Sequence, residues 1–270
     1  MRGTSQTSRD AVLRAFAPVA KAAGKDGARL ADELFTVVDT LDSSGSLRRA
    51  LTDPARPGTD KGTLVASLFG TMDPRVRDAV TDFSARRWWH QDDLGDAIED
   101  AAVDLLLSSA EAAGVLAAVE EELFRVERTV AAESELHTAL DNRAALPAAR
   151  VALATSVFGT KVSAVTNTLL VRAAGASRGR RFQTMIAYYV KAAAARREQT
   201  VAHVTAATEL SAAQRERLAG LLRAAYGRDI KVNVSVDPFV VGGIKVQVGD
   251  EVIDGTILAR LDEARRRLVG

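Results

Sequence analysis

Histidine is the side chain best suited to acid–base and metal chemistry near neutral pH, and this chain of 270 residues contains three of them. His90, His137 and His203 lie far apart, and none belongs to an HExxH pair or another zinc-ligand spacing. The chain has no cysteine, which excludes disulfides, thiolate nucleophiles and thiolate–metal sites. We therefore interpret the histidines as surface residues and predict no catalytic residue and no metal site.

Two glycine-containing stretches bear on phosphate binding. Lys61-Gly62-Thr63 is similar to the end of a phosphate-binding loop, but Gly58 stands at the wrong spacing and no strand precedes it. Gly175 and Gly179 do not complete a GxGxxG pattern. The sequence predicts no nucleotide and no other cofactor.

Two clusters have both a functional and a structural interpretation. Acidic residues gather at Asp92-Asp93, Asp96 and Glu99-Asp100. This cluster is either a metal site or a source of favourable negative charge at a helix N-terminus. Trp88-Trp89 contains both tryptophans of the chain and is either a ligand-binding box or core plus interface rim. We favour the structural interpretation of both clusters.

The composition is typical of a globular protein, with 47% hydrophobic and 26% charged residues. A net charge of +1 gives no nucleic-acid footprint. No apolar run approaches the ~18 residues of a membrane span, and the first ten residues lack the apolar core of a secretory signal. We expect a cytosolic chain, or one held at the cytosolic face of a membrane through partners.

The last seventy residues alternate between strand and helix patterns. Apolar residues alternate with polar ones over 200–208, 230–236 and 244–248, and a short strand follows at 251–253. Ser211-Ala212-Ala213-Gln214 is a capping box that opens a helix reaching Tyr226. From Thr256 onward the period becomes helical. The pattern predicts a small antiparallel sheet packed with two helices over residues 199–270.

The front of the chain contains an internal repeat at an offset of 89 residues. Aligning Glu33–Thr81 with residues 122–170 gives 15 identities over 49 positions, against roughly four expected by chance. Helical stripes recur within each copy, and glycines at 24 and 45 are expected to end helices. The repeat predicts two tandem antiparallel helical bundles, over residues 1–100 and 101–198.

No proline or long loop separates the two bundles. Only Gly95 interrupts the helical pattern between the last helix of the first copy and the first helix of the second. We therefore predict one continuous helix over about 94–113, shared by both bundles and coupling them stiffly. The fold class is mostly α, with a small α+β C-terminal domain.

The C-terminal motif resembles the δ subunit of F-type ATP synthases, the family of the oligomycin-sensitivity-conferring protein. Paired glycines, a strand and then GDEVIDGTI followed by Arg-Leu are similar to the family pattern, with Thr256 in place of the usual serine. The likeness runs from about Ala101 to the end, and residues 1–100 resemble the duplicated bundle of the long form found in high-GC Gram-positive bacteria. The motif residues are Gly242, Gly243, Gly249, Asp250, Ile253, Asp254, Gly255, Arg260 and Leu261.

The resemblance implies a non-catalytic stator subunit that links the catalytic head to the peripheral stalk and resists rotor torque during ATP synthesis. The implied partners are the α subunits of the head, with β subunits as further candidates, and b-type stalk subunits. The implied location is the cytoplasmic face of the bacterial cell membrane. No nucleic acid and no direct membrane span are expected.

The resemblance also implies a groove for the N-terminal helix of an α subunit, between the first and fifth helices of the second bundle. By position, the groove residues are Leu105, Ser109, Ala112, Val165, Leu169 and Arg172.

Two other functions stay open: a helical adaptor of another complex, and an enzyme with a site between bundle and sheet.

Overall fold

The computed structural model separates the chain into two compact units, Met1–Ala192 and Ala193–Gly270. The structure describes residues 3–198, 201–226, 230–237, 240, 242–249 and 251–255. Most described residues are helical and the sheet is small, which confirms the predicted fold class.

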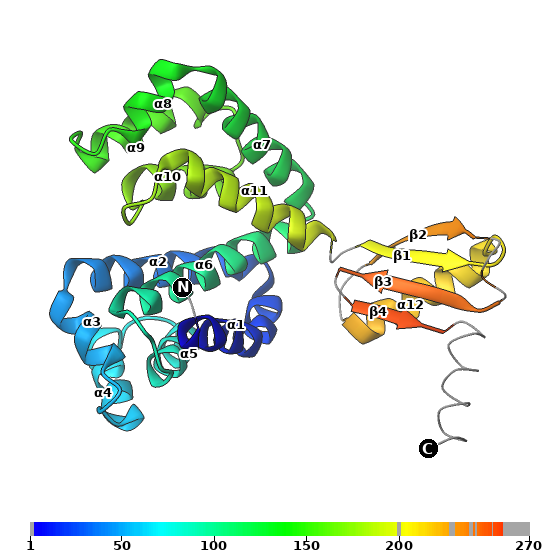
Figure 1. Ribbon diagram of the computed structural model, residues 1–270, viewed down its shortest axis with the longest axis horizontal. Coiled ribbons are helices and arrows are strands. Elements are labelled where there is room, and N and C mark those ends of the chain that lie inside the picture. The colour runs from blue at the N-terminus through cyan, green and yellow to red at the C-terminus, as the bar shows by residue number, and fades with distance from the viewer. Residues whose placement is uncertain are drawn as a thin grey trace. The chain divides into compact units, whose positions relative to one another are not determined.

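The first unit consists of two groups of helices (Figure 1). The first group comprises α1 (Thr4–Ala23), the short 3-10 helix η1 (Gly24–Asp26), α2 (Gly27–Ser43), α3 (Gly45–Thr52), α4 (Gly58–Leu68), α5 (Pro74–Ala85) and α6 (Gln91–Ala112). The second group follows with α7 (Leu116–Ala132), α8 (Ser134–Asp141), α9 (Pro147–Phe158), α10 (Ala164–Gly175) and α11 (Phe182–Glu198), whose last residues belong to the second unit.

Helix boundaries follow the internal repeat. Adding 89 to the bounds of α2 and α3 gives those of α7 and α8, and the same shift brings α4 and α5 within one residue of α9 and α10. Gly24 ends α1 with a φ of 53°. The prediction that Gly45 ends a helix is wrong, because Ser44 is the extended break and its hydroxyl caps α3, which begins at Gly45. The division at residues 100 and 198 stays a prediction.

A repeated glutamate anchors the fifth helix of each bundle at its N-terminus. In the first bundle, the Asp73 N–H donates to Glu33 at 2.7 Å, and Asp73 itself caps α5 by accepting from the Arg75 N–H at 3.0 Å. In the second bundle, Glu122 accepts from the Ser163 N–H at 2.9 Å and from the Thr166 hydroxyl. Negative charge is favourable at this end of a helix because the free N–H groups point outward there.

The opposite end of the same helix is anchored by a repeated basic residue. Lys61 of α4 is buried and donates to the Ser84 carbonyl at 3.0 Å, and Arg150 of α9 donates to the Ala174 carbonyl at 2.9 Å. Lys61 therefore caps α5, and its burial lowers its pKa. In Lys61-Gly62-Thr63 the lysine therefore has a structural partner, the C-terminal end of α5.

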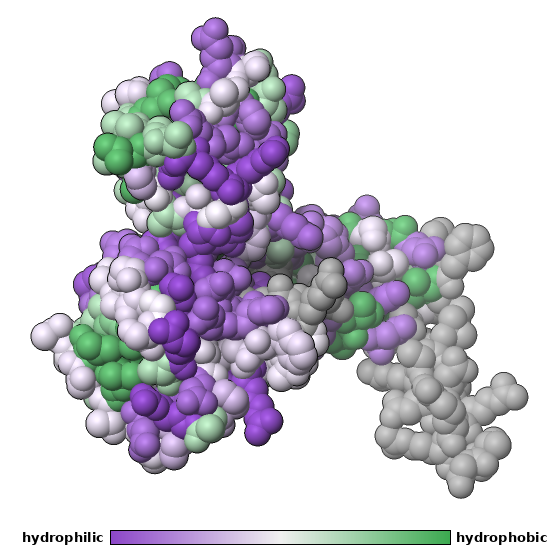
Figure 2. Space-filling model, turned by 60° about the vertical axis from the view of Figure 1, so that its left-hand side comes forward, coloured by the Kyte–Doolittle hydropathy of each residue, from purple (hydrophilic) through white to green (hydrophobic). Residues whose placement is uncertain are grey.

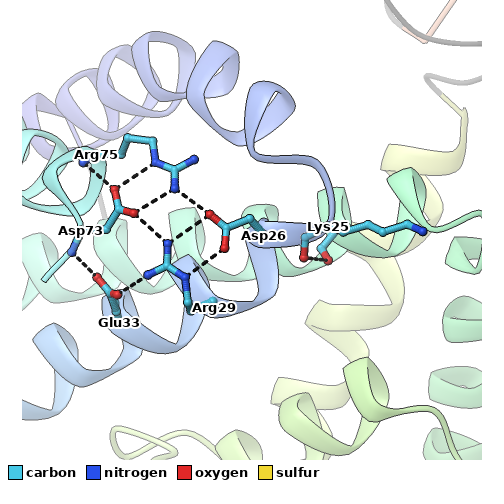
Figure 3. Close-up of polar contacts among 7 residues, drawn as sticks. Lys25, Asp26, Arg29, Glu33, Asp73 and Arg75 are labelled. Carbon is cyan, nitrogen blue, oxygen red and sulfur yellow. Dashed lines mark hydrogen bonds and ion pairs between the residues drawn. The ribbon is translucent and has the colours of Figure 1, made fainter.

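Ionic contacts reinforce the α2–α5 contact in the first bundle (Figure 3). Arg29 bridges Asp26, Glu33 and Asp73, and Arg75 bridges Asp26 and Asp73. Hydrogen bonds from Arg75 and Arg29 hold the pKa of Asp73 well below its usual range. The network fixes where α5 begins relative to α2.

Helix α6 runs unbroken through Gly95 and contacts α1, α2, α3 and α5 of the first bundle as well as α7 and α10 of the second. The prediction of a single continuous helix shared by both bundles is confirmed. Its apolar residues, from Leu94 to Ala110, are buried nearly all round the helix, as expected for a helix in the middle of a core.

The second unit is a four-stranded sheet with one described helix, α12 (Ala212–Tyr226). The strands are β1 (Val201–Ala206), β2 (Lys231–Val236), β3 (Ile244–Val248) and β4 (Glu251–Asp254), in the order β2-β1-β3-β4. The capping box is confirmed, since Ser211 and Gln214 exchange hydrogen bonds of 2.8 and 3.2 Å. The final helix predicted from Thr256 onward lies outside the described residues.

The sheet is mixed, so the expectation of an antiparallel sheet is wrong for one pair. β1 runs parallel to β2, and antiparallel pairs join β1 to β3 and β3 to β4. The parallel pair arises because α12 is a crossover connection between β1 and β2. Ala202, Val204, Val246 and Val248 of the sheet form the core together with Leu222 of α12 and Ile230.

Candidate partner-binding site

The six predicted groove residues lie on α6 and α10, but they do not form an open channel. Leu105 is fully buried, and its carbonyl oxygen lies 2.9 Å from where a Cβ on Gly27 would be. Ser109 is buried and donates to the Lys25 carbonyl at 3.3 Å. Leu105 and Ser109 of α6 therefore pack against η1 and α2 of the first bundle. The expected opening is filled because α6 already serves the other bundle.

The other four residues divide between surface and interior. Ala112 is exposed and Val165 is half-buried, whereas Leu169 is fully buried. Arg172 is also buried, and it pairs with residues of the first bundle. Only Ala112 and Val165 keep surface that a partner helix could touch.

Arg172 is the centre of a charged junction between the two bundles. Its Nε donates to Glu99 on α6 at 3.3 Å, its Nη1 pairs with Asp39 on α2, and its guanidinium lies 4.9 Å from the centre of the Phe35 ring. Glu99 is only 1% exposed and also pairs with Arg180. A buried carboxylate is costly to desolvate, and the two arginines that pair with it offset that cost. We call Phe35, Asp39, Glu99, Arg172 and Arg180 the clasp.

Arg178 makes a second connection beside the clasp. Its guanidinium lies over Gly95, pairs with Asp42 at 3.5 Å and Asp96 at 3.4 Å, and donates to the Asp92 carbonyl at 3.1 Å. Burial raises the pKa values of Asp42 and Asp96. Figure 2 shows hydrophilic residues along the visible side of this junction.

A polar pocket lies beside the junction and is lined by Gln6, Arg9, Asp96, Asp100, Arg180 and Tyr188. Its charges are already paired: Arg9 and the Tyr188 hydroxyl both donate to Asp100, at 2.5 and 2.6 Å, and Arg180 pairs with Glu99. The charged side chains that line the pocket thus contact one another or neighbouring residues of the junction.

The acidic cluster of α6 both caps the helix, as predicted, and forms ion pairs that the sequence did not predict. Asp93 fits the prediction, because it accepts from the His90 N–H at 3.1 Å at the start of α6 and from the Ser5 hydroxyl at 2.6 Å. The other acids instead receive arginines from elsewhere in the fold. A signal was present: α6 contains no lysine or arginine, so its carboxylates must find cations on other elements.

The remaining chemical candidates occupy structural positions. Trp88 is buried and donates to the Phe83 carbonyl at 2.9 Å, while Trp89 is 75% exposed. His90 precedes α6, His137 lies 3.5 Å from Asp141, and His203 is exposed on β1. Within the described ranges no group of three or more acidic or histidine side chains could hold a metal ion.

The C-terminal motif shapes the β3–β4 hairpin. Gly243 and Gly249 have φ values of 82° and 58°, which favour glycine. Gly255 donates to the Ile244 carbonyl at 2.9 Å, and a Cβ there would lie 3.1 Å from that oxygen. Of the other motif residues, Gly242 precedes β3, Ile253 and Asp254 lie on β4, and Asp250, Arg260 and Leu261 lie outside the described residues.

Hydrophobic side chains remain exposed on edge strand β4. Val252 and Ile253 are each 48% exposed, and β4 pairs with β3 on one side. As consecutive strand residues they face opposite sides of the sheet, so each side of this edge exposes one apolar side chain that is available for a contact. None of the helices within the described residues is long and apolar enough to cross a membrane.

Comparisons with known proteins agree with this architecture. The family model for the ATP synthase delta (OSCP) subunit matches residues 104–268, and this match begins within α6. The chain is 46% identical to ATP synthase subunit delta of Beutenbergia cavernae over 100% of both chains. It is also 46% identical to that of Kineococcus radiotolerans (99% of this chain, 98% of the relative) and 43% identical to that of Streptomyces griseus (91% of each).

The relatives extend over the first bundle, which the family model leaves out, so the long form is shared with them. The chain belongs to the ATP synthase delta (OSCP) subunit family and is a non-catalytic peripheral-stalk subunit of an F-type ATP synthase.

Proposed function

We propose that this chain joins the catalytic head of the ATP synthase to its peripheral stalk and holds the head still against rotor torque. The observation that carries the mechanical part is α6, a single helix that is buried in the first bundle and contacts the second. A shared helix transmits force without a flexible linker. The clasp adds charged contacts across the same junction.

The helical unit is proposed to hold the α subunits of the head, with β subunits as further candidates. Ala112 and Val165 are the accessible members of the predicted groove and would contact an α N-terminal helix. Leu105, Ser109, Leu169 and Arg172 would act from the interior by fixing α6 and α10.

The C-terminal unit is proposed to bind b-type stalk subunits through the exposed residues of β4, Val252 and Ile253. Apolar side chains on an edge strand suit the end of an amphipathic stalk helix. The assembled subunit would lie at the cytoplasmic face of the bacterial membrane, attached through its partners.

The experiment uses membranes from which this subunit has been removed while head and stalk remain available. Adding the purified chain should restore ATP synthesis driven by a proton gradient, and ATP hydrolysis by the detached head should not change. A chain that rebinds the membranes without restoring synthesis would contradict the mechanical role. A chain that fails to rebind would contradict the proposed partners.

A further inference from the structure

The internal repeat places two phenylalanines at the same position of the second helix of each bundle. Phe35 on α2 and Phe124 on α7 are separated by the repeat offset of 89 residues. Phe35 is 6% exposed, whereas Phe124 is 44% exposed. Equivalent residues thus have different surroundings, and the reason is visible in the first bundle.

The face of α2 that contains Phe35 receives the second bundle. Arg172 lies over the Phe35 ring and pairs with Asp39, and Arg178 pairs with Asp42 one turn further along. Positions 35, 39 and 42 form one stripe on the helix. The first bundle therefore shows how the second helix of a bundle can bind a neighbouring helix.

On α7 the corresponding stripe is Phe124, Arg128 and Ala131, and all three residues are exposed. Arg128 takes the position of Asp39, so the charge at the centre of the stripe is reversed. Its guanidinium lies 5.9 Å from the centre of the Phe124 ring, and in the described part of the chain it makes no ion pair. Arg125 adds a second exposed positive charge beside it.

The reversed charge decides what this face can bind. A second copy of the chain could not dock through α10 in the same way, because Arg172 is buried and already pairs with Asp39 and Glu99 of its own chain. The counterpart of Arg172 in the first bundle is Phe83, which is buried and unavailable. An element that carries carboxylates satisfies Arg125 and Arg128, and an apolar side chain on the same element covers Phe124.

We propose that the face of α7 formed by Phe124, Arg125 and Arg128 binds an amphipathic helix that presents carboxylates, from another subunit of the ATP synthase. The contact imitates the α2–α10 junction with the charges exchanged. It is separate from the predicted α6–α10 groove and rests on the proposed function only in naming the assembly that supplies the helix. Ala131 and Ala132 leave room for close approach.

The first test compares two charge reversals in the full-length chain. Arg128→Glu should weaken rebinding to subunit-depleted membranes about tenfold, which corresponds to about 1.4 kcal/mol. Arg49→Glu, at an exposed arginine of α3 in the first bundle, makes the same charge change and should rebind normally. Circular dichroism and the melting temperature should stay unchanged in both variants.

The second test locates the partner helix in the purified synthase. A photo-reactive phenylalanine at position 124 should cross-link to a helical segment of another subunit that contains Asp or Glu, and reversing that acid to lysine should restore the binding of Arg128→Glu. Normal rebinding of Arg128→Glu, or a cross-link only to a second copy of this chain, would overturn the inference alone. Failure of the wild-type chain to rebind would overturn both this inference and the proposed function.

Discussion

Single side chains place the helices of this protein, and Asp73 is the clearest case. It caps α5 and is bound by Arg75 and Arg29, both of which stabilise its ionised form. Its pKa in the folded chain is therefore lower than the ordinary value of 3.8. Such a group contributes stability above its unfolded pKa and loses that contribution as the pH falls toward the folded pKa.

We predict that Asp73→Asn lowers the free energy of unfolding at pH 7 and that the difference from wild type shrinks below about pH 4. Urea denaturation at pH 7 and pH 3 measures both values. Asparagine also caps helices, so the difference in free energy of unfolding between the variant and wild type reports the loss of the negative charge. Asp82→Asn, at a half-buried aspartate of the same helix, serves as control. A difference that stayed constant with pH would contradict the assignment.

At the scale of the elements, the close contact between α2 and α6 depends on a glycine. Gly27 is the first residue of α2, and a Cβ there would lie 2.9 Å from the Leu105 backbone oxygen and 3.4 Å from Ser109 Cβ. A backbone oxygen in the middle of a helix cannot move without shifting the helix. Gly58 is likewise the first residue of α4, but a Cβ there would lie an ordinary 3.8 Å from Ala85.

This pair gives a matched experiment. Gly27→Ala should destabilise the helical unit by about 1–3 kcal/mol because it forces the packed helices apart. Gly58→Ala should be neutral or stabilising by up to about 1 kcal/mol, since alanine is less flexible in the unfolded chain. Thermal and urea unfolding measure both effects. Equal stability of the two variants would show that α2 and α6 are less tightly packed than described.

Elements were predictable from sequence where the cause is local. The Ser211 capping box and the helical stripes depend on residues within a few positions of one another, and both appear in the structure. The parallel pairing of β1 with β2 and the charged junction depend on residues far apart in sequence. Local patterns carry no information about which distant arginine meets Glu99.

The predicted groove shows the same limit at the candidate site. The six residues lie on α6 and α10, but the exposure of Leu105 and Ser109 depends on what covers α6. The resemblance describes a bundle whose first helix has no second bundle on it. In this chain that face is already occupied, and periodicity alone cannot show which bundle occupies it.

For the whole molecule, α6 sets the smallest piece that can fold. Ser108 donates to the Ala20 carbonyl at 3.0 Å, and Ala101, Ala102 and Leu105 are buried. These residues come after the predicted boundary at residue 100, yet Ser108 and Leu105 contact the first bundle. A cut at that boundary removes the second half of a core helix.

We therefore expect a fragment of residues 1–112 to fold, with a sharp thermal transition and a dispersed amide spectrum by NMR. A fragment of residues 1–100 should lose the transition or melt at a much lower temperature, because it exposes the apolar surface that α6 covers. The junction surface uncovered in the longer fragment includes the carboxylates of Asp42 and Glu99, which favour solubility. Identical melting curves would mean that α6 contributes little to the first bundle.

The helix that closes one bundle and opens the next also constrains how such a protein can grow. A further duplication would add five helices instead of six and would insert no hinge, so the arm would lengthen in fixed steps of 89 residues. Each added module would inherit its orientation from the one before it. Reach could then be altered by gene duplication alone while the stiffness needed under load is retained.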